Sequence, residues 1–225
     1  MKNIIAINGS PKVKDSASAN IIGRLAKITG MPVTGYQAVK LLGQADVLET
    51  IKKILEADTI LVVFPLYVDA LPAPLVRVLS LLEQANAAKI AANAATARIK
   101  VYAVCNCGFF EPANTMPAFD IIENFCVSAK MKWCGGAGLG GGGFVASQNP
   151  NIEKGPAAGI HAMLHSFGKL IAEGEKTENV FAAPKIPRFV YSLGGNLGWR
   201  QMAKKNKTGR SLGARPYEKA PDTIN

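Results

Sequence analysis

The sequence has few of the features that mark exported, membrane-spanning or disulfide-stabilised proteins. Four cysteines in 225 residues are too few for the disulfide framework of a small secreted domain. No apolar run approaches the roughly 20 residues that a membrane-spanning helix needs. The apolar start of the chain also lacks the small-residue cleavage site of a secretory signal. We therefore expect a cytoplasmic protein with no membrane span.

Acidic side chains are scarce, and the resulting positive charge is concentrated near the end of the sequence. The chain has 26 basic and 16 acidic residues, a net charge of +10. Residues 185–225 carry nine of the basic residues and only two of the acidic ones. Such a segment could bind nucleic acid, an anionic membrane or a phosphorylated substrate, or could simply be a solvated extension. Its aromatic residues Tyr191, Trp199 and Tyr217 are widely spaced and no RNA-binding motif is present, which disfavours nucleic acid.

The usual sets of catalytic and metal-binding residues are missing as well. His161 and His165 are the only histidines, and no third ligand accompanies them, so we expect no metal site. The cysteines lack the clustered spacing of an iron–sulfur centre. A G-x-G-x-x-G match at Gly138–Gly143 is followed by Phe144 rather than by the start of a helix, which argues against a dinucleotide turn. We interpret this glycine-rich stretch as a loop after the fifth strand that borders the ligand.

What the sequence does contain is a regular alternation of strand-like and helix-like segments over about the first 175 residues. Apolar runs rich in β-branched residues alternate with stripes of apolar residues spaced three or four apart. This pattern predicts an α/β fold with a doubly wound parallel sheet in residues 1–175, followed by a basic C-terminal extension, residues 176–225. We expect the extension to pack on the domain or on a neighbouring subunit. The strand candidates are Ile4–Ile7, part of Val33–Leu42, Thr59–Leu66, Val101–Cys105 and the segment from Lys132 onward.

The loops that follow the first, third and fourth strands are the candidate binding loops, because ligands of such sheets bind beyond the carboxyl ends of the strands. They are Gly9–Ser18, Pro65–Leu71 and Asn106–Glu111. The first is rich in serine and lysine and leads into a helix, whose free N–H groups attract anions. It could equally be an ordinary helix cap.

Read together, three motifs in these loops make the chain resemble the flavodoxin-like NAD(P)H-dependent FMN reductase family. The motifs are INGSPK, FPLYVDALPAP and CNCGFFEP, in that order. The resemblance implies a five-stranded sheet of order 2-1-3-4-5, bound FMN, NAD(P)H as the reductant and a homodimer or homotetramer. It also implies that FMN is held by Ser10, Lys12, Ser16, Ala17, Ser18, Pro65, Leu66, Tyr67, Val68, Asp69, Asn106, Cys107, Gly108 and Phe109.

The implied activity is hydride transfer from NAD(P)H through FMN to a quinone, a flavin or another small acceptor. The flavin carries this chemistry, so no catalytic side chain is expected. The chain departs from the family in having Lys12 where arginine is commoner; an ammonium can still neutralise phosphate. Two other functions stay open: an electron carrier of the flavodoxin type, and a module that binds nucleic acid or a membrane surface through its basic end. Cys105 or Cys107 could be redox-active or simply a small buried side chain.

Overall fold

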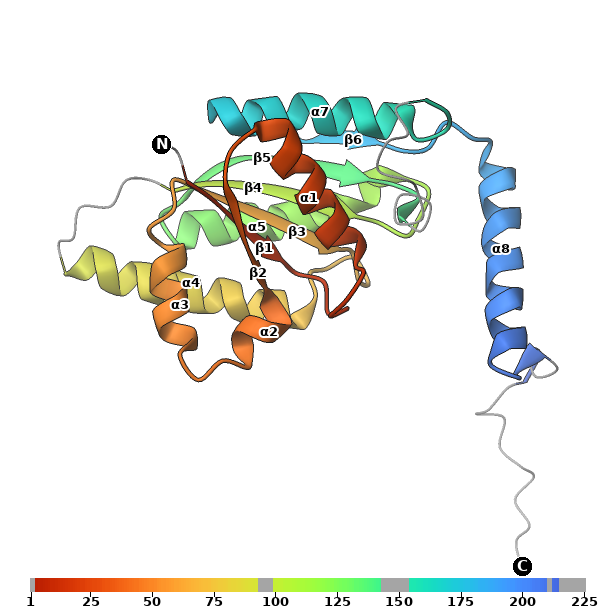
Figure 1. The fold of residues 1–225 in the computed structure, drawn as a ribbon, viewed down its shortest axis with the longest axis horizontal. Coiled ribbons are helices and arrows are strands. Elements are labelled where there is room, and N and C mark those ends of the chain that lie inside the picture. Colours follow the sequence, from red (N-terminus) through yellow and green to blue (C-terminus); the bar gives the residue numbers. More distant parts are fainter. Residues whose placement is uncertain (1–2, 93–98, 143–153, 210–211, 215–225) are drawn as a thin grey trace, which may run out of the picture. The chain divides into compact units, whose positions relative to one another are not determined.

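The protein is built on a parallel β-sheet with helices on both faces (Figure 1). The computed structural model describes residues 3–92, 99–142, 154–209 and 212–214. Its sheet has six strands in the order β2-β1-β3-β4-β5-β6, and every neighbouring pair is parallel. The strands are β1 (Ile4–Asn8), β2 (Val33–Gln37), β3 (Thr59–Pro65), β4 (Lys100–Asn106), β5 (Lys132–Leu139) and β6 (Val180–Ala182).

The expectation of five strands is therefore wrong by one, although the first five have the expected order. β6 has only three residues, too short for alternation to reveal it in the sequence. It pairs with the end of β5, from Ala137 to Leu139. Part of the segment expected as the second strand is also helical, because α2 begins directly after β2.

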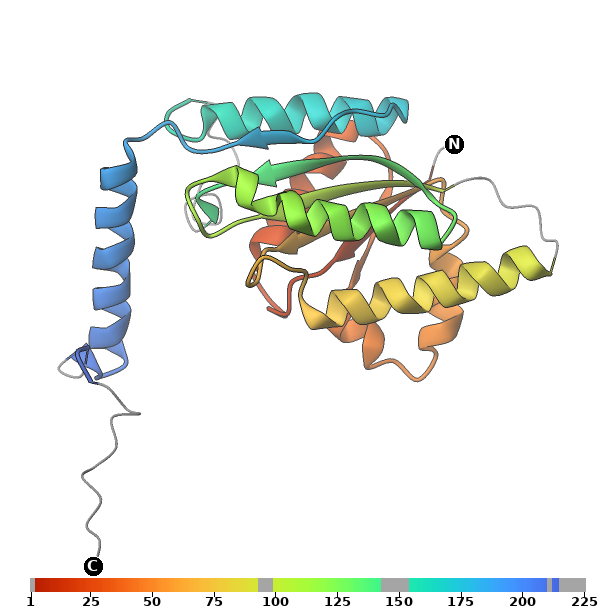
Figure 2. The ribbon, with the colours of Figure 1, turned by 180° about the vertical axis from the view of Figure 1, so that it is seen from behind.

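Helices cover the two faces of the sheet in separate layers (Figures 1 and 2). α1 and α7 lie on one face, and α2, α3, α4 and α5 lie on the other. Alternate strand residues point to opposite faces, so Ile5 and Ile7 enter one core while Ile4 and Ala6 enter the other. The helices are α1 (Ala17–Thr29), α2 (Ala38–Leu42), α3 (Val47–Ile54), α4 (Ala73–Ala91), α5 (Met116–Ser128) and α7 (Ala158–Glu173), with a 3₁₀ turn, η1, at Pro112–Thr115.

The chain divides into two compact units, residues 1–185 and residues 186–225. The first contains the whole sheet and both cores. The second contains helix α8 (Arg188–Lys205), in which no residue is buried. The sequence predicts a basic extension here and no particular element, and three glycines interrupt the apolar residues of α8. Within the described ranges, no helix is both long enough and apolar enough to cross a bilayer.

Candidate binding site at the strand ends

A cavity of about 330 Å³ lies where β1, β3 and β4 end. It contains residues of all three predicted binding loops, together with one residue from the glycine-rich stretch after β5. Four predicted residues, Val68, Asp69, Cys107 and Phe109, do not line it, and two that were not predicted, Asp15 and Gly142, do. The lining is Ser10, Lys12, Asp15, Ser16, Ala17, Ser18, Pro65, Leu66, Tyr67, Asn106, Gly108 and Gly142.

The first loop is held in shape by Asn8, the last residue of β1. Its Oδ1 accepts the Ser10 N–H at 3.0 Å, and its Nδ2 donates to Ser16 Oγ at 3.2 Å. Ser16 is the N-cap of α1, and its Oγ also accepts the Ala19 N–H at 3.1 Å. The expected helix cap is therefore present. The same cap brings the first turn of α1, with its unpaired N–H groups, into the lining of the cavity.

Charge in the lining cancels, which decides how an anion would be held there. Lys12 is the one cation and Asp15 the one carboxylate in this set of residues. Lys12 Nζ donates to the Asp15 backbone oxygen at 3.0 Å, and Gln37 Nε2 donates to the Lys12 backbone oxygen at 2.8 Å. Because the formal charges sum to zero, backbone N–H groups and serine hydroxyls are the main attraction for an anion at this loop.

Close packing beneath the first loop requires a glycine. The Gly9 N–H donates to the Val63 carbonyl oxygen at 2.8 Å, which continues the pairing of β1 with β3. A Cβ at this position would lie 2.7 Å from Leu75 Cδ2 and 2.8 Å from Phe64 Cβ. Any larger residue would therefore lift the loop away from the ends of the strands.

The second loop is a tight turn that carries an exposed valine. Tyr67 and Ala70 exchange two backbone hydrogen bonds, of 3.0 and 3.1 Å. The two residues between them, Val68 and Asp69, have φ angles of +49° and +59°, as in a type I′ turn. A β-branched residue with a positive φ is strained, and Val68 is 95% exposed. The turn leaves Leu66 and Tyr67 in the cavity and directs Val68 to its outside.

The third loop meets the glycine-rich stretch at Asn106 and Gly142. The Gly142 N–H donates to the Cys107 carbonyl oxygen at 2.6 Å, and a Cβ on Gly142 would lie 2.8 Å from both amide atoms of the Asn106 side chain. Asn106 is only 8% exposed, and its Oδ1 accepts no hydrogen bond from the residues that the structure describes. The stretch predicted as a loop after the fifth strand, Gly138–Gly143, reaches the cavity at Gly142, but its first two residues belong to β5, and Gly143 lies outside the described ranges.

The two cysteines near the cavity are not activated thiols. Both are buried, and burial raises the pKa of Cys105 and of Cys107. The Phe109 N–H donates to Cys107 Sγ at 3.3 Å and opposes the rise, whereas the carboxylates of Asp69 and Glu111 add to it. At neutral pH both groups stay protonated, so nucleophilic thiolate chemistry at this site is disfavoured.

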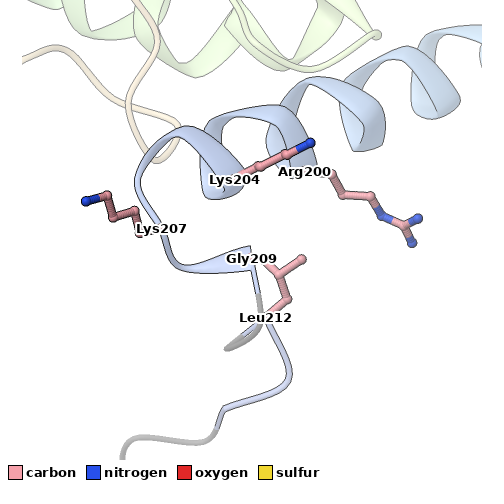
Figure 3. A pocket seen from close by; sticks show the side chains of 5 residues that line it. All are labelled: Arg200, Lys204, Lys207, Gly209 and Leu212. Carbon is pink, nitrogen blue, oxygen red and sulfur yellow. The ribbon is translucent and has the colours of Figure 1, made fainter.

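Elsewhere the described chain offers no competing site of comparable construction. His161 lies beside Arg24, whose NH1 is 2.9 Å from His161 Nδ1, and no three His, Cys, Asp or Glu residues in the described ranges gather as metal ligands. A wider hollow of about 690 Å³ lies within residues 186–225 and is lined by Arg200, Lys204, Lys207, Gly209 and Leu212. Figure 3 shows the Lys207 side chain pointing away from those of Arg200 and Lys204, as on a solvated basic surface.

No protein-family model matches the chain, and no curated protein matches its sequence. Solved structures do match. A flavone reductase aligns with 78% of this chain, with a TM-score of 0.58 and 14% identity. The alignment covers 66% of the flavone reductase, slightly under two thirds of its length. The apo form of an NADH:FMN oxidoreductase aligns over 76% of this chain and 90% of its own, with a TM-score of 0.53 and 16% identity.

The rubredoxin oxygen:oxidoreductase of the anaerobe Desulfovibrio gigas aligns over 77% of this chain, with a TM-score of 0.53 and 9% identity. Only 36% of that longer protein is covered. The strand order β2-β1-β3-β4-β5 is that of flavodoxin. This strand order and the structural matches together show that the chain has the flavodoxin-like fold.

Proposed function

We propose that this protein is an FMN-dependent oxidoreductase that takes reducing equivalents from NAD(P)H and passes them to a quinone, a free flavin or another small acceptor. One observation carries the proposal: the three loops that resemble flavin-binding motifs converge on one cavity at the ends of β1, β3 and β4. In sheets of this order, the β1/β3 switch point is where flavodoxin holds its FMN.

The cavity fits the chemical character of FMN from one end to the other. Its volume lies in the range of small-molecule sites, about 300–1,000 Å³. Serine hydroxyls and the first turn of α1 supply donors for a phosphate, while Pro65, Leu66 and Tyr67 supply an apolar wall for a flat ring. The unsatisfied Oδ1 of Asn106 needs an N–H donor, and FMN carries one on its ring.

The protein's own residues would bind and orient the cofactor rather than transfer protons. When bound, the flavin supplies the redox chemistry, accepting hydride from a nicotinamide and passing electrons onward. Ser10, Ser16 and the start of α1 would anchor the phosphate, and Tyr67 would lie along the ring. Gly142 leaves space that any Cβ would take from the Asn106 amide. We propose no catalytic acid or base.

Two further observations support the proposal. Two solved structures that share this fold are, by their names, a flavone reductase and an NADH:FMN oxidoreductase. All four cysteines are free and buried, which suits a reducing compartment such as the cytoplasm. We also propose that the chain forms a homodimer or homotetramer, which is what the resemblance of its three loops to flavin reductases implies.

The visible absorption spectrum tests this function directly. The purified protein, incubated with FMN and desalted, should retain the bands of oxidised flavin, and NADH or NADPH should bleach them in the absence of oxygen. Free FMN at the same concentration is the control for uncatalysed reduction. Failure to retain flavin would overturn the proposal. Retained flavin that dithionite bleaches but NAD(P)H does not would point instead to an electron carrier of the flavodoxin type.

A further inference from the structure

The end of β2 holds the first loop from a second strand. Gln37 is the last residue of β2, and it pairs with Asn8, the last residue of β1, in the parallel ladder. Its Nε2 donates to the Lys12 carbonyl oxygen at 2.8 Å and lies 3.4 Å from the Ser10 carbonyl oxygen. Two carboxamides at the ends of neighbouring strands therefore hold the same loop.

The two carboxamides bind complementary groups of one stretch of backbone. Asn8 Oδ1 accepts the Ser10 N–H, whereas the Gln37 amide faces the carbonyl oxygens of Ser10 and Lys12. Ser10 Oγ accepts the Lys12 N–H at 3.2 Å. In the described part of the chain, no other residue beyond Ser16 forms a hydrogen bond with residues 10–15. Gln37 is thus the one distant tie on this segment among the residues that the structure describes.

The Gln37 side chain is not used by the helix that it precedes. Gln37 occupies the N-cap position of α2, but its side chain makes no capping hydrogen bond there. Glutamine is also not among the residue types that cap helices well. Gln37 does not line the cavity, so it would act on a ligand only through the loop.

The orientation of the loop backbone decides whether the loop attracts or repels an anion. The formal charges of Lys12 and Asp15 cancel, so the attraction depends on N–H groups and hydroxyls. A carbonyl oxygen that turned toward an anion would repel it, because the oxygen carries a partial negative charge. The N–H and C=O of a trans peptide point in opposite directions, so holding the Lys12 carbonyl oxygen also fixes the direction of the Val13 N–H.

We propose that Gln37 is a positioning residue: its amide keeps the Lys12 carbonyl oxygen on the β2 side, and so sets the first loop in the shape that receives a phosphate. Without this donor, the Lys12 carbonyl oxygen has no hydrogen-bond partner among the described residues and can turn toward the anion. The identity of the phosphate as that of FMN rests on the function proposed above, whereas the hold on the loop does not.

Ligand affinity tests this positioning. Gln37→Met keeps the length of the side chain, adds no charge and removes both N–H donors. FMN and riboflavin, which differ only in the phosphate, are titrated into cofactor-free protein, with quenching of flavin fluorescence as the signal. We expect the affinity for FMN to fall about fivefold, as for one lost hydrogen bond, and that for riboflavin by no more than about twofold. Gln84→Met, at an exposed glutamine that bonds within α4, should change neither affinity.

Trypsin supplies a second readout that needs no flavin. Trypsin cleaves after lysine, and Lys12 is exposed in the loop. Cofactor-free Gln37→Met should be cut after Lys12 about fivefold faster than the unmodified chain, because a loop released from β2 opens more often. Cleavage after Lys53, within α3, reports general unfolding and should not change. Mass spectrometry of the fragments identifies each cut, and Gln84→Met should be cut at the unmodified rate.

The two readouts separate the alternatives. Equal loss of affinity for FMN and for riboflavin would overturn the proposal, because the effect should fall on the phosphate. An unchanged rate of cleavage after Lys12 would overturn it as well. Faster cleavage in a protein that never retains either flavin would uphold the hold on the loop and remove the function proposed above. Retained FMN that Gln37→Met does not weaken would do the reverse.

Discussion

At the scale of single residues, the first loop makes the sharpest demand on charge. Ser10 is buried at the cavity, in a lining whose formal charges already cancel. We expect Ser10→Asp to abolish FMN retention without unfolding the protein, because a carboxylate there opposes the phosphate at a cost of several kcal/mol. Cofactor occupancy after desalting measures the effect. Ser10→Asn is the matched control, because asparagine is nearly as large as aspartate but uncharged, and this variant should retain more FMN than Ser10→Asp. Equal loss of FMN in the two variants would mean that side-chain volume, not charge, is responsible.

The N-cap Ser16 should contribute to stability as well as to the site. Its Oγ accepts hydrogen bonds from the Ala19 N–H and from Asn8 Nδ2. Ser16→Ala should lower the free energy of unfolding by about 1 kcal/mol, measured by urea titration. Ser128→Ala, at an exposed serine on α5, should change it little. An unchanged urea midpoint in Ser16→Ala would show that the cap bond contributes nothing.

The buried thiols should make the fold sensitive to alkaline pH. Burial raises the pKa of Cys105 and Cys107 above the ordinary value of about 8.5, and it raises the pKa of Cys126 to about 12. The contribution of these thiols to the free energy of unfolding is complete below about pH 8.5. It is lost as pH rises above that value, because the unfolded chain then releases thiol protons that the folded chain keeps.

The free energy of unfolding should therefore fall with a slope of up to about 1.4 kcal/mol per pH unit for each thiol. Urea titrations from neutral pH to about pH 10 measure it. Cys126→Ala should make the decline shallower than in the unmodified chain. A flat profile would mean that these thiols are not shielded from water in solution.

The sequence correctly predicts the site residues whose position is fixed by the strand that they directly follow. Ser10, Leu66 and Asn106 each follow an apolar run closely, so the parallel sheet brings them together at one edge. Val68 follows a strand just as closely and still does not line the cavity. Its direction depends on the positive φ angles of a tight turn, and a β-branched residue such as Val68 does not predict a positive φ angle.

At the scale of secondary-structure elements, the turn between Tyr67 and Ala70 carries strain that a substitution should release. Val68→Asn should raise the free energy of unfolding by about 1 kcal/mol, because asparagine tolerates a positive φ and an exposed valine loses little packing. The measurement is a urea titration at a protein concentration low enough to keep the chain monomeric. The matched control, Val127→Asn, replaces an exposed helical valine and should not stabilise the protein.

Long elements with a clear period are predictable from this sequence, and short or unpartnered ones are not. β3 and β4 are buried apolar runs, and α1 and α7 have apolar residues on one side, so local pattern and tertiary packing agree. β6 exists because it pairs with β5, which three residues cannot signal. The apolar residues of α8 do not gather on one side, so they lack the period by which a helix is recognised in a sequence.

At the scale of the whole molecule, the boundary of the first unit can be tested by truncation. A chain that ends at Lys185 keeps β6, the Asn179 side chain that accepts the Gly136 N–H at 2.8 Å, and Phe181, whose ring is 6.2 Å from that of Phe119. A chain that ends at Thr177 loses all three. We expect the shorter chain to be less stable by about 2–3 kcal/mol in urea titrations, with the longer one near the unmodified monomer. Equal stability of the two truncated chains would show that β6 is dispensable.

The position of the cores in the chain has a consequence for how the protein is made. Both cores are complete at residue 182, and 40 residues follow the boundary at Lys185. At a synthesis rate of about 5–20 residues per second, those 40 residues take roughly 2–8 s, longer than many small domains need to fold. All residues of the cavity are thus synthesised before α8 is. Because α8 is synthesised after the residues of both cores, it has less chance of being trapped inside a nascent core.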